Sequence, residues 1–255
     1  MIKILTIREI KIGEGIPKIC VPIVGKTHFE IIDEAKEILN HSVDLVEWRG
    51  DWFDEVFEFE KVLETLKSLR AIFKDIPLLF SFRTIQEGGQ KSIPLDEYAS
   101  LIKYVINTSM VDLVDVELLT AGDELFVDLI HEAHENGVKI VASNHDFQKT
   151  PSVDHMVSIL RKMQDLGADI PKLAVMPRSK SDVLELLMAT TIMNENYGDR
   201  PIITMSMSGT GLISRLAGET FGSAVTFGAV SKTSAPGQIS AEDLSTMLKI
   251  LHKNT

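Results

Sequence analysis

Eight short apolar runs, spaced along the whole chain, constrain the fold of this sequence more than any other feature. They lie at 18–24, 44–49, 77–82, 112–118, 139–145, 172–176, 201–208 and 223–230. Segments with helical periodicity separate them; in 241–251, for example, apolar residues recur every three or four positions. Strands that are apolar throughout and joined by helices pair in parallel, with both faces covered. Eight such units in 255 residues predict a (β/α)8 barrel rather than an open doubly wound sheet.

The start of the chain differs from these units. Residues 4–12, ILTIREIKI, alternate between apolar and polar side chains, which is typical of an extra strand or hairpin. We expect this segment to close the bottom of the barrel. No linker, low-complexity tract or internal repeat interrupts the sequence, so residues 1–255 are expected to form a single domain.

Local signals also mark helix ends. Gly137 and Gly167 each follow a helical pattern, where a glycine commonly stops a helix. Ser240 followed by Asp243 resembles a capping box that opens the last helix.

Charge and composition narrow the class of partner. The net charge of -11 argues against nucleic acid or an anionic membrane as the main partner, because both bind concentrated positive charge. A small anionic substrate stays compatible, since a few local arginines can outweigh the overall field. The single cysteine, Cys20, cannot form an internal disulfide, and no run approaches the roughly 18 apolar residues of a membrane span. Charges interrupt the N-terminal apolar residues before an apolar core of signal-peptide length develops. We therefore expect a cytoplasmic protein.

Charged residues lie at alternating positions within the predicted strands. Glu47 and Arg49 share one face of the second strand, as Asp115 and Glu117 do on the fourth. The other charged residues at strand ends are Arg83, Glu87, His145 and Lys172. Because outward faces pack against helices, these groups should point inward or lie at the rim. A single pair, such as Glu47 with Arg83, is equally well explained as a structural ion pair. Together, inside a barrel normally filled by Val, Ile and Leu, they predict a binding or catalytic site at the carboxyl ends of the strands.

Lys172 has two possible roles that the residues alone leave open. Alternation places it on one face of its strand with Ala174 and Met176, inside the barrel. It could be a permanent counter-ion, or a neutral amine that attacks a carbonyl to form a Schiff base. Nearby arginines would favour the neutral amine and nearby acids the ammonium.

His145 is the only one of seven histidines that closes an apolar run. A histidine at a strand end is suited to proton transfer near neutral pH. His131 and His134 lie three apart and lack the spacing and further ligands of a zinc site, so no metal site is predicted.

Two late loops add candidate ligands. Gly209 and Gly211 precede a predicted helix that carries Arg215, a pattern that could hold a phosphate or a carboxylate. In the loop 232–240, Ser234 and Gln238 offer neutral hydrogen-bonding groups at the barrel mouth. Nearby Met205 and Met207 could fill the core or line a pocket wall.

Six ordered motifs together resemble type I 3-dehydroquinate dehydratase of the shikimate pathway. They are EWR (47–49), FSFRTIQEGG (80–89), SNHDFQKTP (143–151), ADIPKLAVMP (168–177), MSMSGTGLISRLAGE (205–219) and SAPGQI (234–239). The resemblance covers essentially the whole chain. It implies a (β/α)8 TIM barrel, usually a homodimer, that dehydrates 3-dehydroquinate without a metal or dissociable cofactor.

The resemblance also implies roles for individual residues. Lys172 would form the Schiff base with the C3 ketone, His145 would move the proton from C2 to the departing C1 hydroxyl, and Glu87 would orient His145. Arg215 would hold the substrate carboxylate. The remaining contacts would be Glu47, Arg49, Arg83, Ser234 and Gln238 to the hydroxyls, and Met205, Met207 and Phe227 around the ring.

One difficulty and two alternatives accompany this interpretation. By the predicted boundaries Lys172 begins its strand while His145 ends its own, so the two residues are expected far apart along the barrel unless strand stagger joins them. A class I aldolase acting on a sugar phosphate would use the same lysine, with the glycine loop as its phosphate site. A non-catalytic protein that binds a small acid would use the lysine only as a counter-ion.

Overall fold

Eight parallel strands form a nearly closed barrel in the computed structural model, which describes residues 3–230 and 232–254. The sheet order is β10-β3-β4-β5-β6-β7-β8-β9. Where the two end strands β9 and β10 meet, Ile202 and Ser223 form a parallel bridge, and Ala224 N donates to Ile202 O at 2.8 Å. The strands are β3 (Lys18–Ile23), β4 (Leu45–Arg49), β5 (Leu78–Ser81), β6 (Leu113–Glu117), β7 (Lys139–Asp146), β8 (Ile170–Val175), β9 (Ile203–Ser206) and β10 (Val225–Phe227). The predicted (β/α)8 barrel is confirmed.

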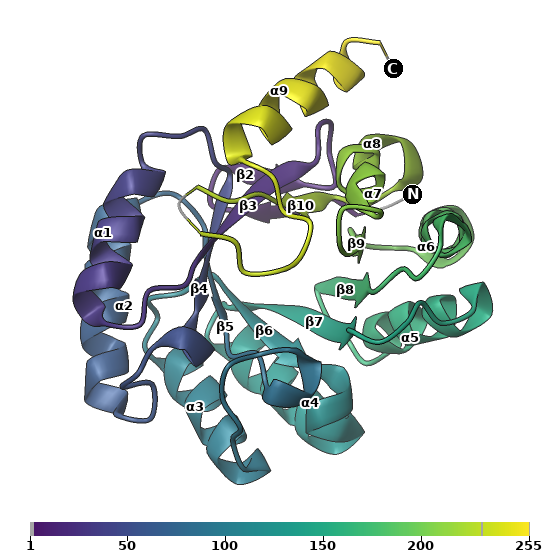
Figure 1. Cartoon of the computed structure of the whole chain (residues 1–255). Coiled ribbons are helices and arrows are strands. Elements are labelled where there is room, and N and C mark those ends of the chain that lie inside the picture. Colours follow the sequence, from purple (N-terminus) through teal and green to yellow (C-terminus); the bar gives the residue numbers. More distant parts are fainter. Residues whose placement is uncertain (1–2, 231, 255) are drawn as a thin grey trace.

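Helices surround the barrel on its outer side (Figure 1). They are α1 (His28–Ile38), α2 (Phe59–Phe73), α3 (Leu95–Asn107), α4 (Leu118–Glu135), α5 (Val153–Asp165), α6 (Lys180–Ile192), α7 (Leu212–Leu216), α8 (Gly218–Phe221) and α9 (Ala241–His252). Short 3-10 turns follow β4 (η1, Gly50–Trp52) and β5 (η2, Ile85–Glu87), and a π turn (η3, Met193–Tyr197) follows α6. No helix in the described part of the chain is long and apolar enough to cross a membrane.

The predicted helix signals agree with the structure. Gly137 and Gly167 lie just beyond α4 and α5 with φ of 73° and 102°, the left-handed region that glycine enters without a steric penalty. Ser240 caps α9, and its Oγ accepts from Asp243 N at 3.0 Å; in place of the reciprocal half of the predicted capping box, Ser240 Oγ donates to Asp243 Oδ2 at 2.7 Å.

The N-terminal segment forms a hairpin that closes the bottom of the barrel, as predicted. Strands β1 (Leu5–Ile7) and β2 (Ile10–Ile12) pair antiparallel. Ile7 and Ile12 are buried in one apolar cluster with a residue from the amino-terminal part of every barrel strand. We call these residues the lower layer: Cys20, Leu45, Leu79, Leu113, Val141, Ile170, Ile203 and Val225.

Two predicted strand limits were wrong in ways that matter for the site. The predicted strand 223–230 is restricted to Val225–Phe227. The predicted strand 172–176 begins at Ile170 instead, because the strand continues through Pro171, a residue that usually marks a strand end.

The longer β8 corrects the expected separation of Lys172 and His145. In the parallel ladder, Lys172 pairs with Ser143 and His145 pairs with Ala174. The two residues are therefore offset by only two positions on adjacent strands, about 7 Å along the barrel at about 3.3 Å per residue.

Candidate active site

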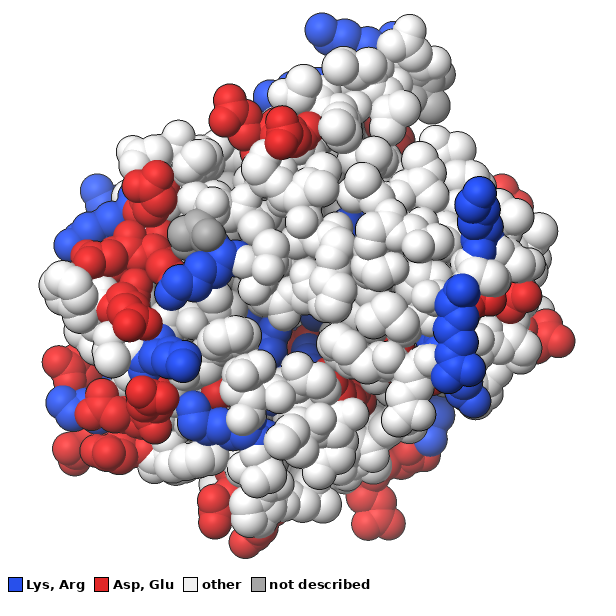
Figure 2. Space-filling view, in the orientation of Figure 1, with Lys and Arg blue, Asp and Glu red and all other residues white. Residues whose placement is uncertain are grey.

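A pocket opens at the carboxyl ends of the strands, and Figure 2 shows a small central opening in which charged atoms are visible within a largely uncharged surface. Of the residues to which the family resemblance gave a role, all but Arg215 line this pocket. The lining comprises Glu47, Arg49, Arg83, Glu87, Gly88, His145, Phe147, Lys172, Ala174, Met205, Met207, Phe227, Ser234, Ala235 and Gln238.

Lys172 lies inside the barrel, one pleat above the lower layer, and only 3% of its surface is exposed. Its Nζ is 3.2 Å from Asp115 Oδ2 and 3.8 Å from Glu47 Oε1. The same nitrogen lies over the Phe227 ring, 4.8 Å from the ring centroid. Ser81 Oγ donates to Glu47 Oε1 at 2.7 Å, which fixes that carboxylate.

Arg83 forms ion pairs with several of the buried carboxylates. Its guanidinium is 2.8 Å from Asp115 Oδ1 and 2.9 Å from Glu117 Oε1, and Ser143 Oγ accepts from it while donating to Asp115. Burial acts to raise the pKa of Asp115, but Arg83 and Lys172 outweigh burial and hold that pKa below its usual value. The hypothesised Arg83–Glu47 pair is replaced by these pairs, because Glu47 faces Lys172.

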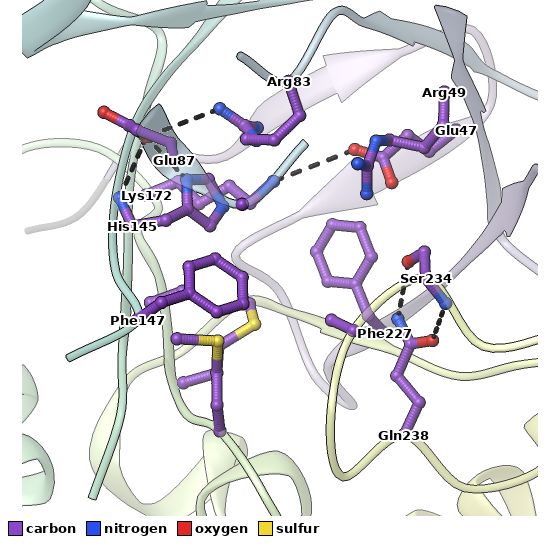
Figure 3. Close-up of a pocket in the computed structure, with 15 residues that line it drawn as sticks. Glu47, Arg49, Arg83, Glu87, His145, Phe147, Lys172, Phe227, Ser234 and Gln238 are labelled. Atoms are coloured by element: carbon purple, nitrogen blue, oxygen red, sulfur yellow. Dashed lines mark hydrogen bonds and ion pairs between the residues drawn. The ribbon is translucent and has the colours of Figure 1, made fainter. Parts of the chain in front are cut away.

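Glu87 and His145 form a hydrogen-bonded pair at the rim (Figure 3). His145 Nδ1 is 2.9 Å from Glu87 Oε2, which also accepts from the His145 backbone N at 3.0 Å. Asn144 Nδ2 donates to the other oxygen at 3.3 Å. This double attachment fixes the imidazole relative to its own backbone, with Nε2 on the side away from Glu87.

Both members of the pair have shifted pKa values. Burial, followed by the positive charges of Arg83, Lys172 and Arg49, lowers the pKa of His145 well below its usual value. Burial and the Glu117 carboxylate raise the pKa of Glu87 to about 8, against the effect of Arg83. The imidazole is therefore neutral near pH 7, the form that can accept a proton.

Arg215 lies on α7, behind the pocket wall, and is 2% exposed. Its Nη2 donates to Pro236 O at 3.1 Å, its Nη1 is 3.7 Å from Met205 Sδ, and its Nε is buried without a partner. No carboxylate of the described residues acts on its pKa, which burial alone lowers to about 10. A buried guanidinium without an acid beside it is suited to an incoming anion.

The loop between β10 and α9 lies over the centre of the barrel in Figure 1 and carries the remaining polar lining residues. Ser234 N donates to Gln238 Oε1 at 2.8 Å, and Gln238 Nε2 donates to Ser234 Oγ at 3.1 Å. Pro236 O accepts from Ser208 N at 3.2 Å as well as from Arg215. The loop is thereby joined to the segment that begins α7.

The sequence prediction missed some pocket residues and the partners of some buried charges. Phe147 lies two residues after His145, so continuing the alternation of that strand would have brought its ring to the same side. Asp115 and Glu117 were recognised as inward-facing charges but not as partners of Lys172 and Arg83, because pairing across strands leaves no signal in the sequence. Among the described residues, no group of three or more His, Cys, Asp or Glu could hold a metal ion.

Comparison with known proteins gives one consistent result. The family model for type I 3-dehydroquinase matches residues 19–255. A 3-dehydroquinate dehydratase of Clostridioides difficile is 54% identical over 97% of both chains, and one of Clostridium botulinum is 52% identical over the full length of both.

Solved structures agree. The crystal structure of type I 3-dehydroquinate dehydratase from Clostridium difficile with covalently modified comenic acid has a TM-score of 0.97 and 53% identity, and covers both chains completely. The 3-dehydroquinate dehydratase of Geobacillus kaustophilus has a TM-score of 0.96 and 41% identity over 99% of this chain and 98% of that one.

Proposed function

This chain belongs to the type I 3-dehydroquinase family, and we propose that it dehydrates 3-dehydroquinate through a Schiff base on Lys172, with His145 as general base and acid. The observation that carries the proposal is the offset of only two residues between these side chains on β8 and β7, both of which line one pocket. The covalently modified comenic acid of the C. difficile relative supports covalent chemistry in this family.

Lys172 attacks the C3 carbonyl carbon of the substrate. Its Nζ first releases a proton, for which Asp115 and Glu47 are acceptors at 3.2 and 3.8 Å. The resulting carbinolamine then loses the carbonyl oxygen as water and leaves a protonated imine. The imine draws electrons from C2, so that the C2 proton becomes acidic enough for a histidine to remove.

His145 removes that proton through Nε2. The C2–H electron pair first moves toward the imine to give an enamine; the enamine then returns its electrons to form the C1–C2 double bond as the C1 hydroxyl departs, and His145 gives the proton to the leaving oxygen. Glu87 holds Nδ1 and so keeps Nε2 directed toward the substrate. Hydrolysis of the imine releases 3-dehydroshikimate and restores the free lysine.

Substrate binding uses the remaining lining residues. Arg215 binds the substrate carboxylate, which supplies the partner that its buried guanidinium lacks. Glu47, Arg49, Arg83, Ser234 and Gln238 contact the hydroxyls, and Met205, Met207 and Phe227 surround the ring. Because no step needs a metal or dissociable cofactor, full turnover is expected after dialysis against EDTA.

Borohydride reduction in the presence of 3-dehydroquinate tests the mechanism. The expected result is irreversible inactivation and a mass increase on Lys172 that matches the reduced adduct, with Lys180→Ala as the control because Lys180 is exposed on α6. Labelling only by phosphorylated aldehydes or ketones would indicate the aldolase instead. Substrate binding without any adduct would reduce Lys172 to a counter-ion.

We further propose that the chain is a homodimer, located in the cytoplasm, whose residues 1–255 form one domain. The exposed apolar side chains of Leu184 (66%) and Met188 (55%), one turn apart on α6, are candidates for the interface. Light scattering should give twice the chain mass, and Leu184→Glu should lower the measured mass.

A single calorimetric transition would support one domain. Fractionation of the host cell tests the proposed location in the cytoplasm.

A further inference from the structure

We propose that Asp51 is a positioning residue that holds both the Arg49 guanidinium and the loop carrying Glu87, a role that rests on the functions proposed above for those two residues. The loop comprises residues 82–91 and is called the Glu87 loop. Asp51 lies in η1, directly after β4, and is completely buried. It does not line the pocket, so it acts only through other residues.

The Asp51 carboxylate binds Arg49 through both oxygens. Arg49 Nε donates to Oδ1 at 2.7 Å and Arg49 Nη2 donates to Oδ2 at 2.8 Å. A bidentate pair fixes the plane of the guanidinium as well as its position. Since Arg49 lines the pocket, Asp51 determines how that guanidinium meets the substrate.

The same two oxygens hold the Glu87 loop on either side of Glu87. Arg83 N donates to Oδ1 at 3.3 Å and Gln90 N donates to Oδ2 at 3.1 Å. Lys91 Nζ adds a third attachment by donating to the carbonyl oxygens of Asp51 (2.9 Å) and Phe53 (2.8 Å).

The loop between these attachments is compact. Thr84 O accepts from Glu87 N at 3.0 Å and from Gly89 N at 2.8 Å. A Cβ at Gly89 would overlap the Arg83 carbonyl oxygen, so only glycine permits this path. A displacement of the loop ends would therefore move Glu87 and, through Nδ1, the imidazole of His145.

Only a carboxylate satisfies this arrangement. The two Asp51 oxygens accept four N–H groups. Two come from Arg49, and the other two are the backbone N–H groups of Arg83 and Gln90 at the two ends of the Glu87 loop. An asparagine offers one acceptor oxygen and an NH2 donor, so an N–H group of the amide would face the N–H groups of Arg49 or the loop. Asp51→Asn would therefore release either the Arg49 guanidinium or the Glu87 loop, and it would leave Arg49 without its counter-charge.

Steady-state kinetics of Asp51→Asn, with Asp54→Asn as the matched control, test the proposal. Asp54 lies three residues further on, is exposed and loses the same charge. For Asp51→Asn we expect KM to rise about tenfold and kcat to fall by up to about 100-fold, the effect of a small misplacement of catalytic groups. The acid limb of the kcat profile should also shift, because moving the Glu87 carboxyl changes the hydrogen bond that holds His145 Nδ1.

A folded Asp51→Asn enzyme with the KM, kcat and acid limb of Asp54→Asn would overturn the proposal. If Asp51→Asn does not fold, Lys91→Ala carries the test, since Lys91 holds the Glu87 loop to the Asp51 backbone without touching Arg49. It should shift the acid limb with KM within about twofold of wild type, and an unchanged profile would overturn the role of η1 in holding the loop. Borohydride trapping of the wild-type enzyme fails separately if the Schiff-base mechanism is wrong.

Discussion

The barrel interior has two layers built on the same strands with opposite chemistry. In the lower layer, Leu45, Leu113 and Ile170 pack against the N-terminal hairpin. Two residues further along the same strand faces lie Glu47, Asp115 and Lys172, which begin the charged layer. One pleat thus separates a site of apolar packing from a site of buried charge.

The two layers contribute differently to the protein. Burying a Leu or Ile side chain stabilises a fold by about 1.5–3 kcal/mol, without needing a specific partner. Buried charges in the upper layer stabilise little and are tolerated only when each one has its partners. The lower layer should therefore determine stability and the upper layer activity, and substitutions in either layer test this division.

Replacing Lys172 should have the largest effect on activity. Lys172→Ala removes the proposed nucleophile, so dehydration of 3-dehydroquinate should fall below detection in a direct absorbance assay of the product. Circular dichroism should report an intact barrel. Near-wild-type turnover in this variant would rule out the covalent mechanism.

His145→Ala should lower kcat by about 10²–10⁴-fold, the usual contribution of a general acid–base group. The variant keeps Lys172, so borohydride with substrate should still label it. Mass spectrometry that finds no adduct would mean that His145 is also needed to form the imine.

Leu79→Ala should lower the stability of the protein and leave its activity nearly unchanged, the opposite of a substitution in the charged layer. Leu79 is 3% exposed in the lower layer, and truncating such a side chain costs about 2–5 kcal/mol of unfolding free energy. Urea unfolding measures the loss, while KM and kcat of the folded variant should stay within about twofold of wild type. A large drop in kcat would contradict the division into layers.

Glu87→Gln should have the smallest effect on rate among the three substitutions in the charged layer, with a distinctive pH dependence. With its pKa raised to about 8, Glu87 keeps its proton on the acid side of the kcat profile, as a neutral amide does, and becomes a carboxylate on the basic side. The variant should therefore keep the acid side of the profile and lose rate, by about tenfold, as pH rises through 8, because the carboxylate favours the tautomer with Nδ1–H and leaves Nε2 free to accept a proton. A kcat equal to that of wild type on the basic side would mean that Glu87 does not act on His145.

Stability gives an independent check of the same carboxyl. The pKa of Glu87 is raised in the folded chain from 4.5 to about 8. The folded state therefore holds this proton more strongly than the unfolded state, and the stabilisation is complete below pH 4.5 and lost as pH rises toward 8. Wild type should lose unfolding free energy relative to Glu87→Gln over this range in urea titrations at several pH values.

Most of the fold could be read from the residues because its signals are local. The eight strands, the hairpin and the caps at Gly137, Gly167 and Ser240 each follow from periodicity or cap chemistry over a few positions. The residues lining the pocket followed in part from alternation and in part from the family resemblance. Pro171 misled the prediction, because a proline inside a barrel strand is unusual.

The sequence by itself determined which side chains face the barrel interior, because alternation is a property of one strand. The tertiary structure alone decided how neighbouring strands align, which brings Lys172 beside Ser143 and close to His145. It also decided that Arg83 pairs with Asp115 and Glu117, that Arg215 lies behind the pocket wall, and that Asp51 joins η1 to the Glu87 loop. Register and charge pairing depend on how the closed barrel staggers its strands, which no single segment of the chain encodes.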